Sequence, residues 1–585
     1  MLPDYATYEG AIGLDWYAVD PNLRQLADRL LPDAGDRARA EEVFTRYGPL
    51  VGTKIAPRAE ITDRNGPQLS RFDHWGEETN EVVHHPAWLA NKADLVRAGY
   101  TSPEQVPGVV TAGVNYLVCQ AETALICAMG MTTAAADIVA RYAPAGARGA
   151  VLGRLTSADP DSAWEGGMFL TERQGGSDVG ANTTTAVPDG GEWRLTGEKF
   201  FCSNIDAEVF IVLARPEGAP SGSRALGTFI VPSVLPDGSP NGFHMRRLKP
   251  KMGTVGVPTG EVVLDGAIGW LAGGDGAGGR AADDAPARPD GRGINRMMEM
   301  VNGSRFGVAV MGLGIHRRAF LEAAIYAAHR EQFGQRIDQY PMVRETLVDL
   351  LVELEGGMAL TFECAAVTRT TSDADEARLL RRILIPLAKI RATRAAIGAA
   401  SSGLEVFGGN GYMNDWPMAR QLRDAQCHTI WEGTENILCI DVRRAMRGED
   451  AHEALFSRAE RALDAAGGRD VLTGVAEAVA ATLKDARRAV DHLVTAPDDI
   501  QLLHARRLAY LFADLMEGAL LMDEAAWSLD RDGDARKAVV ACRFARQHLE
   551  TRPVRGILDD DRTPLDLFEP VVRYGRIEAS EAVAA

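Results

Sequence analysis

The segment at residues 423–436, RDAQCHTIWEGTEN, constrains this chain more than any other. It begins charged, becomes apolar and aromatic, and then places one carboxylate, Glu432, directly before Gly433. Because removal from water raises the proton affinity of a carboxylate, Glu432 is a candidate general base. Gly433 permits a sharp turn and a close approach of the backbone to a ligand. On local pattern alone, the alternative is a surface glutamate at a helix start capped by Thr434.

Composition limits the classes of function. The 585 residues are 46% hydrophobic, enough for roughly three or four domains with a large core. The net charge is −18, and residues 451–585 hold 18 Lys and Arg against 24 Asp and Glu, which disfavours a nucleic-acid partner. The seven cysteines are scattered without a CxxC pair, as is typical of free thiols in a reducing compartment.

We expect a soluble, cytoplasmic protein. The N-terminus lacks a basic region followed by an apolar run, so we predict no signal peptide. We also find no stretch that reaches the roughly 20 apolar residues that a membrane-spanning helix needs. Adjacent His84 and His85 chelate poorly, so we predict one packed and one solvated side chain and no metal site.

The first 271 residues divide into a helical and a β-rich part. Residues 1–165 form an N-terminal arm and helical domain in this prediction, with helices at 21–31 and 36–48, the second stopped by Gly48, and a buried helix pair between 108 and 143. Residues 166–271 alternate short β-rich runs with turn residues, which predicts a compact β-barrel or sandwich. The predicted strands are 193–195, 199–201, 208–214, 226–231, 243–248 and 261–264.

Helices dominate the rest of the chain. Residues 272–293 are rich in Gly, Ala and Asp and cannot bury a core, which predicts a flexible linker. Residues 294–448 form a predicted four-helix bundle, and residues 449–585 an appended helical domain. The predicted helices are 297–330, 342–370, 376–401, one after Gly433, 451–465, 470–496, 500–529 and 534–550. The fold class is therefore α+β, mainly α.

Two further motifs lie in the β-rich part. TERQGGSDV at 171–179 places two glycines beside hydroxyl groups, which suits a backbone that binds a phosphate or a flavin edge. A turn capped by Asp is the alternative. In GEKFFCSN at 197–204, a strand would put Phe201 and Ser203 on one face. Core packing is the alternative there.

Taken together, the motifs resemble the acyl-CoA dehydrogenase family. TERQGGSDV, GEKFFCSN, REQFG, VFGGNGY and RDAQCHTIWEGTEN follow in the order and spacing of its signature across residues 110–445. LKPKMGT, AIGWLAG and WEGTENILCIDV are most similar to the AidB-like branch, named for an alkylation-response flavoprotein. The resemblance implies an N-terminal helical domain, a middle β-domain, a C-terminal four-helix bundle and FAD. The appended helical extension suits a group within the family whose subunits are larger.

The resemblance also implies roles for individual residues. Glu432 matches the catalytic base, and Ser304 stands where one branch of the family keeps its base instead. The matched cofactor-binding positions are Leu170, Thr171, Ser177, Phe201 (where Trp is usual), Ser203, Arg330, Phe333, Glu405 (where Gln is common), Gly408, Gly409, Thr434 and Asn436 (where Gln is usual). The matched substrate-binding positions are Ser177, Asn302, Arg305 and Gly433. Of the cofactor positions, Arg330, Phe333, Gly408 and Gly409 match residues that reach the FAD of a neighbouring subunit.

The implied enzyme is an oxidoreductase acting on CH–CH bonds in fatty acid metabolism. Glu432 removes the α-proton of an acyl-CoA, or of an acyl carrier protein thioester, while a hydride leaves the β-carbon for the flavin and a 2-enoyl thioester forms. Electron-transfer flavoprotein is the expected acceptor, and a homodimer or homotetramer the expected assembly. The alternatives are a related flavin oxidase using oxygen and an AidB-like DNA-associated protective flavoprotein, against which the acidic C-terminal part argues.

Overall fold

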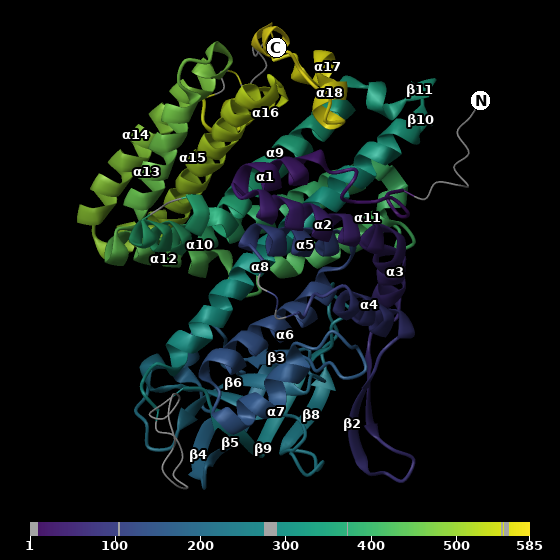
Figure 1. The fold of residues 1–585 in the computed structure, drawn as a ribbon, viewed down its shortest axis with the longest axis vertical. Coiled ribbons are helices and arrows are strands. Elements are labelled where there is room, and N and C mark those ends of the chain that lie inside the picture. The colour runs from purple at the N-terminus through teal and green to yellow at the C-terminus, as the bar shows by residue number, and fades with distance from the viewer. Residues whose placement is uncertain are drawn as a thin grey trace. The chain divides into compact units, whose positions relative to one another are not determined.

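The computed structural model describes residues 10–102, 104, 106–273, 289–370, 373–551, 554 and 561–584 (Figure 1). The chain forms two compact units. The helical unit comprises Met1–Thr53, Val106–Ala121 and Arg305–Ala585. The β-containing unit comprises Lys54–Gln105 and Glu122–Ser304. Most of the predicted linker at 272–293 lies outside the described residues.

The helical unit starts with α1 (Pro21–Leu30) and α2 (Ala34–Leu50), which Asp20 and Asp33 cap by accepting backbone N–H bonds. The prediction that Gly48 stops the second helix is wrong, because α2 passes Gly48 and continues into the π-helix η2 (Val51–Ile55). A Cβ at Gly48 would lie 2.2 Å from Oδ1 of Asp15, so this glycine allows close packing. The unit also contains α5 (Gly108–Ala121), the first of the helices predicted between 108 and 143.

The predicted bundle helices are confirmed with small changes in length. They are α8 (Gly293–His329, whose first twelve residues belong to the β-containing unit), α9 (Pro341–Thr370), α10 (Ala374–Phe407) and α12 (Glu435–Glu449). Helix α10 runs past residue 401, because Gly403 and Phe407 continue its buried face. The sequence did not predict α11 (Pro417–His428), whose buried face is largely polar and includes Arg420, Gln421 and Asp424.

The four helices predicted after residue 449 are confirmed within a few residues. They are α13 (Ala451–Ala466), α14 (Thr473–Thr495), α15 (Asp498–Asp532) and α16 (Arg536–His548), drawn in light green to yellow in Figure 1. The short helices α17 (Thr563–Asp566), α18 (Phe568–Val572) and α19 (Ala579–Ala584) were not predicted. A two-residue hairpin, β10 (Glu331–Gln332) with β11 (Gln335–Arg336), joins α8 to η5 (Ile337–Gln339) before α9.

Besides the start of α8, the β-containing unit has the α-helices α3 (Ala56–Arg64), α4 (Pro86–Arg97), α6 (Thr123–Tyr142) and α7 (Ala145–Leu155) among its described residues. A hairpin of β1 (Gln68–Phe72) and β2 (Glu78–Val83), not predicted from the sequence, precedes α4. His84 pairs with Asp206 at 2.7 Å, and His85 caps α4 by accepting from the N–H of Ala87.

Helix α6 corrects the expectation that no stretch is long and apolar enough to span a membrane. Its 20 residues are long enough to span a membrane, and a mean hydropathy of 1.6 makes them apolar enough. Two thirds of this window is nevertheless buried inside the protein, where Ala135 and Val139 join a core with Val209 and Ile211. Such burial is typical of a core helix.

Within the described residues of the β-containing unit, seven strands form one sheet, and five of them close into a barrel. The strands are β3 (Gly166–Phe169), β4 (Thr185–Asp189), β5 (Glu192–Ser203), β6 (Val209–Pro216), β7 (Gly227–Pro232), β8 (Phe243–Leu248) and β9 (Thr259–Leu271). The ring runs β6–β4–β5–β9–β7 and closes because β7 pairs with β6, while β3 adds to β6 and β8 to β9. Phe169, Phe210 and Phe243 stack on one another in the core.

Two strand predictions need correction. The segments 193–195 and 199–201 belong to the single strand β5. The residues between them, Thr196-Gly197-Glu198, look like a turn in the sequence but lie within the strand. The register against β9 shifts after Leu195, and Gly197 has a φ of 154°, so the strand absorbs a bulge there. Strands β3 and β4 were missed.

A buried ionic network ties α16 to three other helices of the helical unit. Glu355 of α9 pairs with Arg536 at 2.6 Å and with Lys537 at 2.7 Å. Lys537 also contacts Glu524 of α15 at 2.7 Å and the amide oxygen of Asn22 of α1 at 2.5 Å. The four charged side chains are at least 95% buried, so each charge depends on its partners.

Lys537→Met should destabilise the helical unit, because it leaves the carboxylate of Glu524 buried without its ammonium partner. Loss of one member of a buried pair costs about 3–5 kcal/mol. We expect the melting temperature, followed by circular dichroism, to fall by roughly 5 °C or more. Asp485→Asn, which breaks an exposed i,i+3 pair with Arg488, is the control and should leave it within about 1 °C. Equal melting temperatures for both variants would contradict the network's role.

Candidate active site

Glu432 lies in a short turn with unusual backbone angles. Helix α11 ends at His428 and α12 begins at Glu435. Between them Glu432 has a φ of 57° and Gly433 a φ of 108°. A non-glycine residue in this left-handed region costs about 1–3 kcal/mol and persists only where its surroundings hold it. The Thr434 side chain makes no capping hydrogen bond, so the simple helix-start alternative does not describe this turn.

Two buried cations hold the turn. The Nε of Arg305, on α8, donates to the carbonyl of Glu432 at 3.0 Å. The Nζ of Lys389, on α10, donates to the carbonyl of Gly433 at 2.5 Å. Asp441 of α12 accepts from Arg305 at 3.0 Å. Arg382 of α10 binds the other oxygen of Asp441 at 2.8 Å. Three helices therefore fix the backbone on which the Glu432 side chain stands.

The electrostatics of the turn suit proton transfer near neutral pH. Burial raises the pKa of Glu432 to about 7, against the positive charges of Arg305 and Lys389, which lower it. Burial lowers the pKa of Lys389 to about 8, against the charge of Glu432, which raises it. A general base is most effective when its pKa lies near the working pH, so Glu432 is poised for this role.

The β-containing unit brings four of the predicted flavin-side residues together. The N–H of Phe200, on β5, donates to the carbonyl of Thr171 at 3.0 Å, so the loop that follows Leu170 lies along the strand carrying Phe201 and Ser203. The Phe201 ring is 57% exposed, and the Ser203 hydroxyl lies 3.0 Å from that of Thr259. This strand edge therefore offers hydroxyls and an aromatic face to a ligand.

A buried ion pair supports this edge. Glu172 is bound by the ammonium of Lys199 at 2.9 Å and by the hydroxyl of Thr184 at 2.6 Å. Burial alone would raise the pKa of Glu172, but Lys199 and hydrogen bonds from Thr183 and Thr184 lower it to about 2. The carboxylate of Glu172 thus stays charged, and its bond to Lys199 fixes the loop after β3 against β5.

The other predicted residues spread over both units. Phe333 (95% exposed), Glu405, Gly408 and Gly409 lie at the surface of the helical unit, with Arg330 half-buried. Ser177 is exposed and Asn302 half-buried in the β-containing unit. The side-chain oxygen of Asn436 accepts from Arg506 of α15 at 2.5 Å, so this predicted cofactor contact has a protein partner.

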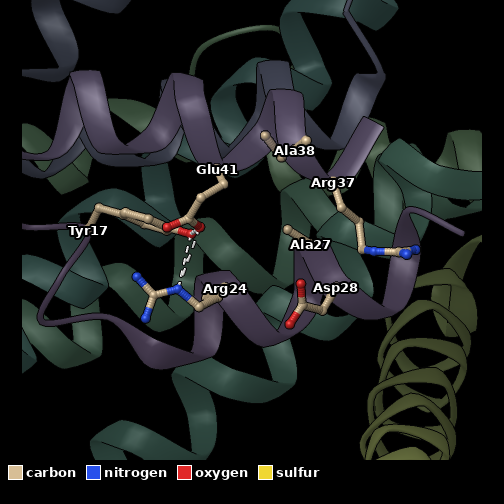
Figure 2. Close-up of a pocket in the computed structure, with 8 residues that line it drawn as sticks. Tyr17, Arg24, Ala27, Asp28, Arg37, Ala38 and Glu41 are labelled. Atoms are coloured by element: carbon tan, nitrogen blue, oxygen red, sulfur yellow. Dashed lines mark hydrogen bonds and ion pairs between the residues drawn. The ribbon is translucent and has the colours of Figure 1, made fainter. Parts of the chain in front are cut away.

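A separate hollow of about 300 Å³ lies between α1 and α2 in the helical unit (Figure 2). Figure 2 shows Tyr17, Arg24 and Glu41 directed toward one another, with the Nε of Arg24 donating to the Tyr17 hydroxyl at 3.3 Å. No residue predicted for the active site lines this hollow. It is therefore distinct from the Glu432 turn.

Sequence reasoning missed the residues that hold the predicted site in place. These are Asp441, Arg382 and Lys389 around Glu432, and Glu172 and Lys199 beside Thr171. One signal was present for Lys389, which is a single charged residue at the end of the apolar run ILIPLAKI. A lone lysine in such a run indicates a buried ammonium ion with a specific partner.

Family models match nearly the whole chain. They are the Adaptive response protein AidB N-terminal domain at residues 9–161, the Acyl-CoA dehydrogenase middle domain at 167–267 and C-terminal domain at 291–447, and the Acyl-CoA dehydrogenase 11 C-terminal domain-like model at 450–566. The last of these matches the appended helices, in which the sequence alone suggested no specific relative.

Relatives agree with these models. Acyl-CoA dehydrogenase family member 11 of Caenorhabditis elegans is 31% identical, with 87% of this chain and 84% of that protein covered. Putative acyl-CoA dehydrogenase AidB of Escherichia coli is also 31% identical, over 74% of this chain and 80% of that protein. The crystal structure of C. elegans ACDH-11 in complex with C11-CoA has a TM-score of 0.84 at 30% identity and covers 95% of both chains.

The chain belongs to the acyl-CoA dehydrogenase family of oxidoreductases. Within that family it is similar to both the AidB and the member 11 proteins. Its appended C-terminal helices match the domain model named for the member 11 protein.

Glu432→Gln should change stability in a pH-dependent way. The folded pKa of about 7 lies above the ordinary value of 4.5, so between these values the folded state binds more protons than the unfolded state. Wild-type stability therefore falls as pH rises from 4.5 to 7. The uncharged variant lacks this loss, so its melting temperature relative to wild type should rise between pH 5 and pH 8. A difference that shrinks over this range would contradict the raised pKa.

Proposed function

We propose that the chain is an FAD-dependent acyl-CoA dehydrogenase that converts an acyl thioester into its 2-enoyl thioester. The observation that carries this proposal is the fixed Glu432 turn, whose carboxylate has a pKa raised to about 7 beside an immobilised backbone. Family membership and the C11-CoA bound to the C. elegans relative support an acyl-CoA substrate.

The residues of the chain fit FAD. Thr171, Phe201 and Ser203 present hydroxyls and an exposed ring along one strand edge of the barrel unit. Gly408 and Gly409, at the end of α10, have no atom within 4 Å of an added Cβ, which leaves their backbone accessible. In this proposal Thr171 and Ser203 would hold the flavin ring, Phe201 would pack against it, and the two glycines would contact FAD of a second subunit.

Glu432 performs the proton transfer. Its carboxylate takes the α-proton of the thioester, while FAD, when bound, supplies the acceptor for the hydride that leaves the β-carbon. The N–H of Glu432 donates to the thioester oxygen and stabilises the charge that develops there. Arg305 and Lys389 keep that N–H and the carboxylate in a fixed relation by binding the carbonyls of Glu432 and Gly433.

Glu432→Gln should retain FAD and acyl-CoA binding yet lose turnover by a factor of about 10² to 10⁴, because the amide cannot accept the proton. Anaerobic bleaching of the flavin by a panel of acyl-CoAs measures this reaction directly. Glu453→Gln, an exposed carboxylate on α13, is the control and should behave as wild type. Activity of Glu432→Gln within tenfold of wild type would remove Glu432 from the role.

The acceptor and the assembly belong to the same proposal. We place electron-transfer flavoprotein as acceptor and a homodimer or homotetramer as the active form. If the reduced enzyme passes electrons to oxygen as fast as it turns over, the protein is an oxidase rather than a dehydrogenase. Tight, salt-sensitive shifting of duplex DNA in a gel would instead support the DNA-associated alternative.

Phe333→Ala should weaken subunit assembly and FAD retention together. Phe333 is 95% exposed with a φ of 52°, so a large apolar ring lies at the surface, where a second subunit could cover it. We expect light scattering to show a smaller species and gel filtration to strip FAD from the variant at least severalfold faster. Leu503→Ala removes another exposed apolar side chain, at 68%, and should change neither. An intact oligomer with normal FAD retention would contradict this role.

A further inference from the structure

A lysine outside the predicted set lies against the Glu432 turn. Lys389 is fully buried, and within the described residues the only hydrogen bond of its ammonium group is to the carbonyl of Gly433 at 2.5 Å. An ammonium ion has three donors and is costly to bury without an opposite charge. The surroundings of Lys389 must therefore supply one.

The charged and titratable groups that face Lys389 come from every element packed against it. They are Glu432 of the turn, Arg305 of α8, Cys427 and His428 of α11, and Glu435 of α12. Among the acidic groups, Glu432 stabilises the ammonium most. Glu435 is already paired with Arg394 at the surface of α10 and with Arg506 at 2.9 Å. Glu432 is thus the acidic group near Lys389 that favours its ammonium form most, and among the described residues it is not in an ion pair with another cation.

His428 does not compete for this charge. It is fully buried, and neither ring nitrogen has a hydrogen-bond partner within the described part of the chain. Burial, together with the nearby charge of Lys389, lowers its pKa to about 3. The imidazole is therefore neutral at every working pH, so α11 adds no histidine charge beside Lys389 and Glu432.

We propose that Lys389 is a positioning residue for the reaction: it fixes the Glu432–Gly433 turn through the Gly433 carbonyl and supplies the buried positive charge that holds Glu432 as a carboxylate. This inference rests on the proposed function, in which Glu432 is the base. It adds that Glu432 and Lys389 titrate as a coupled pair. The apparent pKa on the acid side of the pH–rate profile therefore depends on both groups.

Two variants separate the hydrogen bond from the charge. Lys389→Gln keeps an N–H donor for the Gly433 carbonyl but removes the charge, and Lys389→Met removes both. An opposite charge nearby lowers a carboxyl pKa by about one to three units, so the acid limb of kcat/KM should rise by about one unit in both variants. Lys389→Gln should lose about tenfold in kcat/KM near pH 6 and recover toward wild type near pH 9.

Arg378→Gln is the matched control. It removes a positive charge from the same helix α10, where the guanidinium is 58% exposed and pairs with Glu449 at 2.9 Å. Its acid limb should coincide with that of wild type. An equal shift in this control would show that any charge on α10 suffices and would overturn the specific pairing.

A second readout does not depend on turnover. The infrared difference between wild type and Glu432→Gln isolates the carboxyl band of residue 432, and the same difference in the Lys389→Gln background should titrate about one unit higher. An unmoved band with an unmoved acid limb, or a loss of rate that is equal at every pH, would overturn the inference. An active Glu432→Gln enzyme would overturn the proposed function instead, while the infrared shift would still test the pair.

Discussion

The strained turn at Glu432 and Gly433 exists because two buried cations bind its carbonyl groups. A left-handed glutamate is unfavourable by itself, and without Arg305 and Lys389 the segment would relax toward ordinary helix-start geometry. The cations are in turn fixed, since Asp441 binds Arg305 and Arg382 together. The chain therefore uses ionic contacts among three helices to hold one peptide in place.

The same contacts set the chemistry of the carboxylate. Burial raises the proton affinity of Glu432, and the cations lower it, so that the net pKa of about 7 is a balance between two opposing effects. A turn held only by neutral donors would leave the first effect unopposed and the glutamate protonated at neutral pH. Holding the backbone with charged donors thus solves a structural and an electrostatic problem at once.

The sequence predicted much of this molecule, and its failures have physical causes. Helices α13 and α14 have the amphipathic periodicity that local sequence reveals, and the family resemblance supplied the roles that we predict for Glu432, Thr171 and Ser203. Helix α11 was missed because its buried face is polar, and β5 was divided because a bulge resembles a turn in sequence. Asp441 and Lys389 were missed because their partners are distant in the chain.

The appended helices are part of this arrangement rather than an independent module. Glu435, the first residue of α12, is held by Arg394 of α10 and by Arg506 of α15, while Arg506 also binds Asn436. Arg443 of α12 pairs with Asp498 at the start of α15. Contacts from α15 therefore reach the first turn of the helix that begins directly after Glu432 and Gly433. Because α15 is itself anchored to α9 and α16 through Glu524 and Lys537, the geometry of the Glu432 turn depends on packing that extends into the last 140 or so residues of the chain.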